Sequence, residues 1–140
     1  MTINKDDPAL LASLRKHEGT RDKPYLDTEG HLTIGVGRNL DAKGLRPDEI
    51  RLLLTNDVAD AIADAEALCP TFDALTANRQ RALAEMAFNL GRDRLAVFRK
   101  MWAAIAAWDF KAAAAEALDS KWARQVGQRA RTLADMIEKG

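Results

Sequence analysis

The chain has 140 residues, close to the usual size of a single domain, and 47% of them are hydrophobic while 30% are charged. This balance suits a globular protein and excludes both a disordered chain and a membrane-embedded one. The 21 basic and 21 acidic side chains cancel, so the net charge gives no support to a strongly cationic nucleic-acid binder.

Cysteine and histidine are too scarce to suggest a metal site. Cys69 is the single cysteine, which excludes an intrachain disulfide, and His17 and His31 are the only two histidines. We therefore expect no metal and no cofactor, and we expect both histidines to be solvated or hydrogen-bonded. The charges within residues 1–14 interrupt the apolar stretch that a secretory signal needs, so no signal peptide is predicted.

A helix followed by a β-hairpin is predicted at the start of the chain. Asp7-Pro8 is typical of a helix start, with an N-cap before proline, and Gly19 is a natural helix end. Glu18 then lies in the last helical turn, where the helix dipole disfavours a carboxylate. The alternating residues 24–36 around a glycine turn predict the hairpin, and the sheet is expected to end near Leu40.

Two glycines near the end of the second predicted strand, Gly35 and Gly37, lack side chains that could pack. They indicate a bend or a close approach by a ligand.

The rest of the chain is predicted to be helical. A long helix is expected from Pro47 to Leu68, stopped by Pro70, and another from Thr76 to Gly91. Further helices are predicted to start near Leu95, at Asp109 and at Ser120, and a last helix contains Ala130, Leu133, Met136 and Ile137.

These elements predict an α+β fold that is mostly helical, in one domain over residues 1–140. We expect a small β-hairpin lobe at about 19–46 and a larger helical lobe formed by 1–18 and 69–140. The helix at 47–68 would connect the lobes, and a cleft between lobes is the usual place for a site.

Two carboxylates, Glu18 and Asp27, could meet where the first helix passes into the hairpin. Hydrolysis of a glycosidic bond needs a proton donor for the leaving oxygen and a second carboxylate that activates water or stabilises the cation. Spacing alone, however, favours the simpler interpretation that both are solvated surface groups. Thr33 could likewise be an ordinary strand residue, or its hydroxyl could hold a water beside Asp27.

A longer motif reverses this balance, and it runs through His17-Glu18-Gly19, Tyr25–Gly30 and Leu32–Gly37. Here the chain resembles the phage-type lysozyme family, in which a Glu-Gly ends the first helix, an Asp follows nine residues later and a Thr six residues after that. The likeness continues through Cys69–Leu75, Arg79–Gly91 and Ser120-Lys121-Trp122, so it covers almost the whole chain. The segment between Gly37 and Pro47 looks shorter than in longer members, and Arg38 stands where some members have histidine.

The resemblance implies a lysozyme-like fold and a muramidase that hydrolyses the β-1,4 bond between N-acetylmuramic acid and N-acetylglucosamine. Glu18 would be the general acid, Asp27 would activate a water, Thr33 would hold that water, and the reaction would invert the anomeric carbon. The family's saccharide-binding positions fall on Phe88, Asn89, Lys121 and Arg129. Phe88 could equally be core, and Arg129 could be one more solvated charge in a basic terminal helix.

The resemblance also implies a setting. A phage endolysin would be made in the host bacterial cytoplasm and would act on the periplasmic cell wall after membrane disruption. Its partner would be the peptidoglycan glycan strands, with no nucleic acid and no stable membrane association, and a monomer is expected. The three tryptophans, Trp102, Trp108 and Trp122, are expected to pack in the core or between lobes.

Other functions stay open at this stage. A lytic transglycosylase would need one acid but no positioned water, and a non-catalytic peptidoglycan-binding domain would need neither carboxylate. A helical DNA-binding domain is a further alternative, because Arg124, Arg129 and Arg131 cluster near the C-terminus. The zero net charge weakens that last interpretation.

Overall fold

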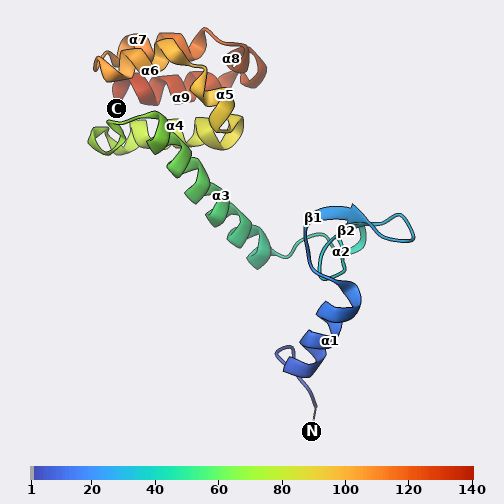
Figure 1. Ribbon diagram of the computed structural model, residues 1–140. Coiled ribbons are helices and arrows are strands. Elements are labelled where there is room, and N and C mark those ends of the chain that lie inside the picture. The colour runs from blue at the N-terminus through green and yellow to red at the C-terminus, as the bar shows by residue number, and fades with distance from the viewer. Residues whose placement is uncertain (1) are drawn as a thin grey trace. The chain divides into compact units, whose positions relative to one another are not determined.

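The computed structural model describes residues 2–140, which form two compact units divided between Arg51 and Leu52. Figure 1 shows one small antiparallel sheet, in the first unit, among many helices. The predicted α+β, mostly helical class is therefore confirmed. Within residues 2–140, no helix combines the length and the apolar character needed to cross a membrane.

The first unit begins with helix α1 (Pro8–Glu18), whose two ends lie where the sequence predicts them. The Asp7 carboxylate accepts a hydrogen bond from the Leu10 backbone N–H at 2.9 Å, which satisfies one of the free amides of the first turn. Gly19 ends the helix with a φ of 76°, a left-handed backbone that glycine adopts without strain. Glu18 is therefore the last helical residue, as expected.

A three-stranded antiparallel sheet follows α1, in the order β1 (Arg21–Leu26), β2 (Leu32–Gly35) and β3 (Arg38–Asn39). Thr33 lies on the central strand and pairs with a residue of each neighbouring strand, Tyr25 on β1 and Asn39 on β3. The sheet ends one residue before Leu40, close to the predicted position. Sequence analysis missed the short helix that comes next, α2 (Leu40–Lys43), which is capped by the Asn39 side chain.

Helix α3 (Pro47–Leu68) has the predicted bounds. Proline at its first position and two acidic residues in its first turn suit a helix N-terminus, because proline needs no amide partner and the acidic groups complement the dipole. The boundary between the two units falls inside this helix, after Arg51. The first unit contains α1, whereas we expected residues 1–18 in the helical lobe, and that lobe division stays a prediction.

The second unit is helical and holds the main core. After the rest of α3 and the short 3-10 helix η1 (Phe72–Ala74), its helices are α4 (Ala77–Leu90), α5 (Arg92–Ala96), α6 (Arg99–Ala106), α7 (Phe110–Leu118), α8 (Lys121–Val126) and α9 (Gln128–Lys139). Helix α7 packs against α6 and α9, and α9 also packs against α4, as Figure 1 shows. The largest side chains that are almost fully buried here are Leu83, Met86, Leu95, Met101, Ile105 and Ile137.

Three helices of the second unit, α4, α7 and α8, start at the predicted caps. Thr76, Asp109 and Ser120 each accept a hydrogen bond from a first-turn amide, at the start of α4, α7 and α8. The predicted start near Leu95 is wrong, because Leu95 lies inside α5 and is fully buried. The chain makes two helices there, and Phe98 precedes the second one without a capping side chain that could have marked it.

The three tryptophans do not share one environment. Trp122 is buried, and Trp102 is half-buried and donates its indole N–H to the Leu95 carbonyl at 3.0 Å. Trp108 is 51% exposed, so the prediction that it packs in the core is wrong. It lies in the turn between α6 and α7 with a φ of 60°, and its ring meets the edge of Phe110 instead.

Candidate active site

Glu18 lies at the end of α1 and its carboxyl group reaches the turn after β2. A Cβ atom placed on Gly37 would lie 2.9 Å from Glu18 Oε2, closer than side chains tolerate. The sequence indicated a close approach by a ligand at this glycine, and the group that approaches is a side chain of the chain itself. The missing side chain of Gly37 therefore makes room for the Glu18 carboxyl group.

Asp27 follows β1 directly and is held by the turn that closes the hairpin. Its Oδ1 accepts the backbone N–H groups of Glu29 and His31, at 2.9 and 2.8 Å, and its own N–H donates to the His31 carbonyl at 2.9 Å. This is an Asx-type turn, which suits an aspartate at this position. One carboxylate oxygen is thus used by the backbone, and Oδ2 is the oxygen left for other partners.

The turn lowers the pKa of Asp27 below its ordinary value. The largest cause is the hydrogen bond from the His31 N–H, and partial burial opposes it. The Glu29 N–H and the positive charge of a protonated His31 lower the pKa further. Asp27 is therefore suited to act as a carboxylate and not as an acid.

Thr33 is the one buried polar side chain of the residues described, with 3% of its surface exposed. Its Oγ1 donates to the His31 carbonyl at 2.8 Å. Since a hydroxyl has one proton, Thr33 Oγ1 can only accept a hydrogen bond from a further partner such as a water.

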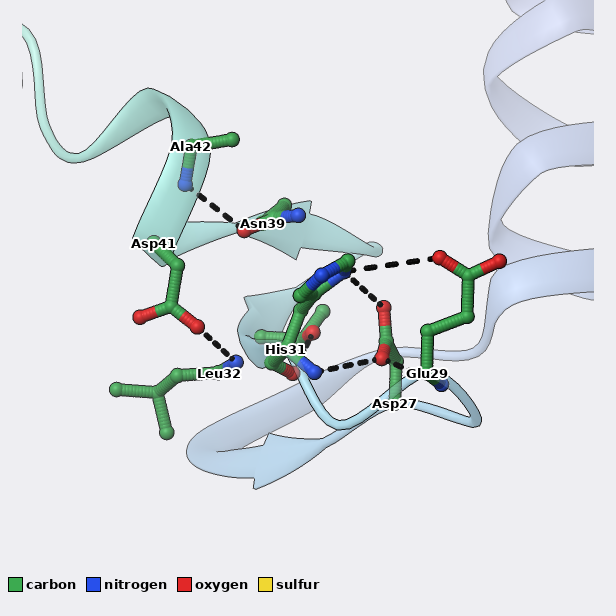
Figure 2. Close-up of polar contacts among 8 residues, drawn as sticks. Asp27, Glu29, His31, Leu32, Asn39, Asp41 and Ala42 are labelled. Atoms are coloured by element: carbon green, nitrogen blue, oxygen red, sulfur yellow. Dashed lines mark hydrogen bonds and ion pairs between the residues drawn. The ribbon is translucent and has the colours of Figure 1, made fainter.

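The His31 side chain lies beside the carboxylates of Asp27 and Glu29, as Figure 2 shows. Its Nδ1 lies 3.6 Å from Asp27 Oδ2 and 3.8 Å from Glu29 Oε2, and its side chain is 45% exposed. From the sequence we predicted a solvated or hydrogen-bonded histidine but did not place it beside Asp27. The four-residue spacing of the two residues could have indicated this contact, because a tight turn after Asp27 returns the chain to its carboxylate.

Arg38, where the resemblance led us to expect histidine in some family members, binds three acceptors. Its guanidinium makes two hydrogen bonds with Glu49, at 2.8 and 2.7 Å, and a third with the Gly44 carbonyl at 3.0 Å. Glu49 lies in the first turn of α3, so the bidentate pair fastens β3 to the start of α3. This contact raises the pKa of Arg38 and lowers that of Glu49, mainly through their shared hydrogen bonds.

The predicted saccharide-binding residues all lie in the second unit, and three of them line two different grooves. Phe88 and Arg129 line a groove of about 660 Å³ between α3 and α4, in which Phe88 is 46% exposed. Arg129 Nε donates to Glu85 Oε2 at 3.2 Å across this groove. Phe88 is thus not a core residue, and Arg129 is paired and not simply solvated.

Lys121 is the first residue of α8, and Asn89 lies near the end of α4. Lys121 is exposed and lines a groove of about 650 Å³ together with Trp122 and Phe98. The Asn89 Oδ1 accepts the indole N–H of Trp122 at 2.7 Å. One end of the amide is therefore used to hold a buried tryptophan, and the NH₂ group is the part that suits a sugar hydroxyl.

The comparison with known families decides to which family the chain belongs. The family described as phage lysozyme matches residues 15–136, which include every candidate site residue named above. The chain belongs to the phage lysozyme family. The resemblance stated from the motifs is therefore confirmed.

Two relatives of this phage lysozyme family member are informative. The pre-baseplate central spike protein Gp5 of Enterobacteria phage T4 is 30% identical over 99% of this chain, but the chain spans only 29% of that protein's length. A probable T4-type lysozyme 2 of Dictyostelium discoideum is 25% identical and is covered over 95% of its length, by 94% of this chain. The chain is thus similar both to one part of a longer protein and to nearly all of a shorter one.

Proposed function

We propose that this protein is a muramidase that hydrolyses the glycan of bacterial peptidoglycan. The observation that carries the proposal is the family match together with the arrangement of Glu18 and Asp27 in the first unit. Glu18 ends a helix and lies against Gly37, while Asp27 is held as a carboxylate by backbone amides. The two carboxyl groups therefore have different environments. A glycosidase needs one carboxyl group that is protonated and one that is ionised.

Glu18 is the proposed general acid, and Asp27 Oδ2 and Thr33 Oγ1 hold the attacking water. The water donates one hydrogen bond to Asp27 Oδ2 and the other to Thr33 Oγ1. The Thr33 hydroxyl itself donates its hydrogen bond to the His31 carbonyl. The lone pair of the water then attacks the anomeric carbon while Glu18 protonates the leaving oxygen. After the step, Asp27 is protonated, Glu18 is a carboxylate, and the two sugars are separate.

Glu18→Gln tests the central role. The amide occupies nearly the same volume but has no acidic proton, so lysis of permeabilised Gram-negative cells should fall by about 100-fold or more. The control is Glu138→Gln, which changes an exposed glutamate on α9. Circular dichroism should show both variants folded, and wild-type turnover in folded Glu18→Gln would remove Glu18 from the mechanism.

The stereochemical outcome tests the role of Asp27. Attack by a water held opposite the acid inverts the anomeric carbon, whereas attack by Asp27 itself would give a covalent intermediate and retention. Proton NMR of a digested peptidoglycan fragment, recorded before mutarotation, should show the α anomer at the new reducing end. An initial β anomer would exclude the held water, and an anhydro end would identify a lytic transglycosylase instead.

A further inference from the structure

His31 is the residue on which Asp27 and Thr33 both depend. Its backbone N–H donates to Asp27 Oδ1, and its carbonyl accepts from the Asp27 N–H and from Thr33 Oγ1, all at 2.8 to 2.9 Å. These contacts would exist for any residue at this position. The imidazole adds a contact that only histidine supplies, with Nδ1 at 3.6 Å from Asp27 Oδ2.

This geometry brings a protonatable ring to the carboxylate oxygen that the backbone leaves free. We propose that the His31 imidazole is a positioning residue for Asp27, which holds Oδ2 in its charged form and limits its rotation. The inference rests on the proposed function for the role of Asp27 in the reaction. The contact itself does not depend on that function.

The charges that face the imidazole determine the direction of its effect. Asp27 and Glu29 face it from the turn, with Glu29 Oε2 at 3.8 Å, and Figure 2 shows both carboxylates directed toward the ring. From α2, which packs against β2, Asp41 accepts the neighbouring Leu32 N–H at 2.8 Å. From β1, the Tyr25 ring carries the guanidinium of Arg21 at 4.4 Å from its centre.

The charged groups within 4 Å of the His31 Nδ1 are both carboxylates, Asp27 and Glu29. Histidine is ordinarily protonated in the acidic range where an aspartate titrates. A cation within about 4 Å of a carboxylate favours the charged form, and Asp27 should therefore keep its charge to lower pH than without His31. Because the ring is partly exposed, salt should weaken the effect.

The test is His31→Gln, which keeps the backbone contacts and removes the charge. The Asp27 carboxyl carbon is followed by ¹³C NMR over a pH titration, at low and at high salt. We expect the midpoint to move to higher pH in the variant, and the salt dependence of the wild type to disappear. His17→Gln is the matched control, since it removes the other histidine, which contacts Ser13 on α1 at 3.3 Å.

Activity provides the second readout. If His31 positions Asp27 for the reaction, the acidic limb of kcat/KM moves to higher pH in His31→Gln by the same amount as the NMR midpoint. An unchanged midpoint, or an equal change in His17→Gln, would overturn the proposal. A shifted midpoint with an unmoved acidic limb would overturn the catalytic part of it. If the midpoint shifts in His31→Gln but the wild-type protein lyses no cells, the proposed muramidase function would be overturned and the contact between His31 and Asp27 would stand.

Discussion

Two glycines on either side of Val36 have nearly the same backbone conformation but different surroundings. A Cβ atom on Gly35, which has a φ of 70°, would meet no atom within 4 Å, whereas one on Gly37, which has a φ of 74°, would meet Glu18. An alanine at either site encounters the same backbone strain, on the order of 1–3 kcal/mol. Only at Gly37 would the methyl group also displace the proposed acid.

Gly37→Ala should therefore lower the lytic rate about tenfold or more relative to Gly35→Ala, because a displacement of about 1 Å can cost a catalytic group much of its effect. The two variants should unfold at similar denaturant concentrations. Chemical denaturation and a turbidity assay on the same preparations would check both statements. Equal losses of activity would show that Gly37 matters only for its backbone conformation.

The candidate site shows how far single residues could be predicted. Glu18, Asp27 and Thr33 follow from a motif with fixed spacing, and the helix end and turn that hold them are local structures that the sequence specifies. The contact of Glu18 with Gly37 joins residues nineteen positions apart, and no local pattern encodes it. The hydrogen bond from the Trp122 indole to the Asn89 side-chain carbonyl joins residues 33 positions apart, so it was not expected either.

At the scale of elements, the Arg38–Glu49 pair connects the sheet to α3. Glu49 has a lowered pKa, chiefly because Arg38 donates hydrogen bonds to it. A carboxyl group whose pKa is lower in the folded state stabilises the fold above its unfolded pKa, near 4.5, and loses this contribution as the pH falls through its folded value. The first unit should thus become less stable in acid.

Arg38→Gln removes the bidentate partner and should lower the melting temperature at neutral pH by several degrees. The difference from wild type should shrink at pH values at which Glu49 is protonated. Arg15→Gln is the control, because Arg15 is exposed on α1 and is not among the groups that shift the pKa of Glu49. Thermal melts across acidic and neutral pH would measure this difference. A loss of melting temperature that does not depend on pH would contradict the stabilising role of the Arg38–Glu49 pair.

The elements themselves were predictable where a side chain marks their ends. Asp7, Thr76, Asp109 and Ser120 are caps that bind the first-turn amides of their helices, so each start could be predicted. Between 91 and 107 no such side chain caps a helix start, and the chain there is organised by burial of Leu95, Met101 and Ile105. Burial depends on partners that are distant in sequence, which is why the predicted start near Leu95 is wrong.

At the scale of the whole molecule, the predicted site residues are divided between the two units. The carboxylates belong to the first unit, while Phe88 and Arg129 line a groove in the second. The groove is largely apolar, formed by side chains such as Leu54, Val58 and Ile62, with charged groups that include Glu85 and Arg129. An apolar surface with few fixed polar groups suits ligand binding, and the pairing with Glu85 fixes the Arg129 guanidinium at this surface.

Arg129 and Arg131 therefore provide a test of whether the second unit takes part in the reaction. Both lie on α9, but Arg129 lines the groove and pairs with Glu85, whereas Arg131 is exposed and donates to Gln128 at 3.0 Å. A charge-assisted hydrogen bond contributes about 1.5–3 kcal/mol. Loss of one that Arg129 makes to the substrate would therefore lower kcat/KM about tenfold or more. Arg129→Ala should show this loss and Arg131→Ala should remain near wild type.

Steady-state kinetics on a defined peptidoglycan fragment would measure the loss of kcat/KM, with Glu85→Gln alongside to separate loss of the cation from loss of its partner. If both arginine variants lost activity equally, Arg129 would be a surface charge and the reaction would depend on the first unit for its charged groups.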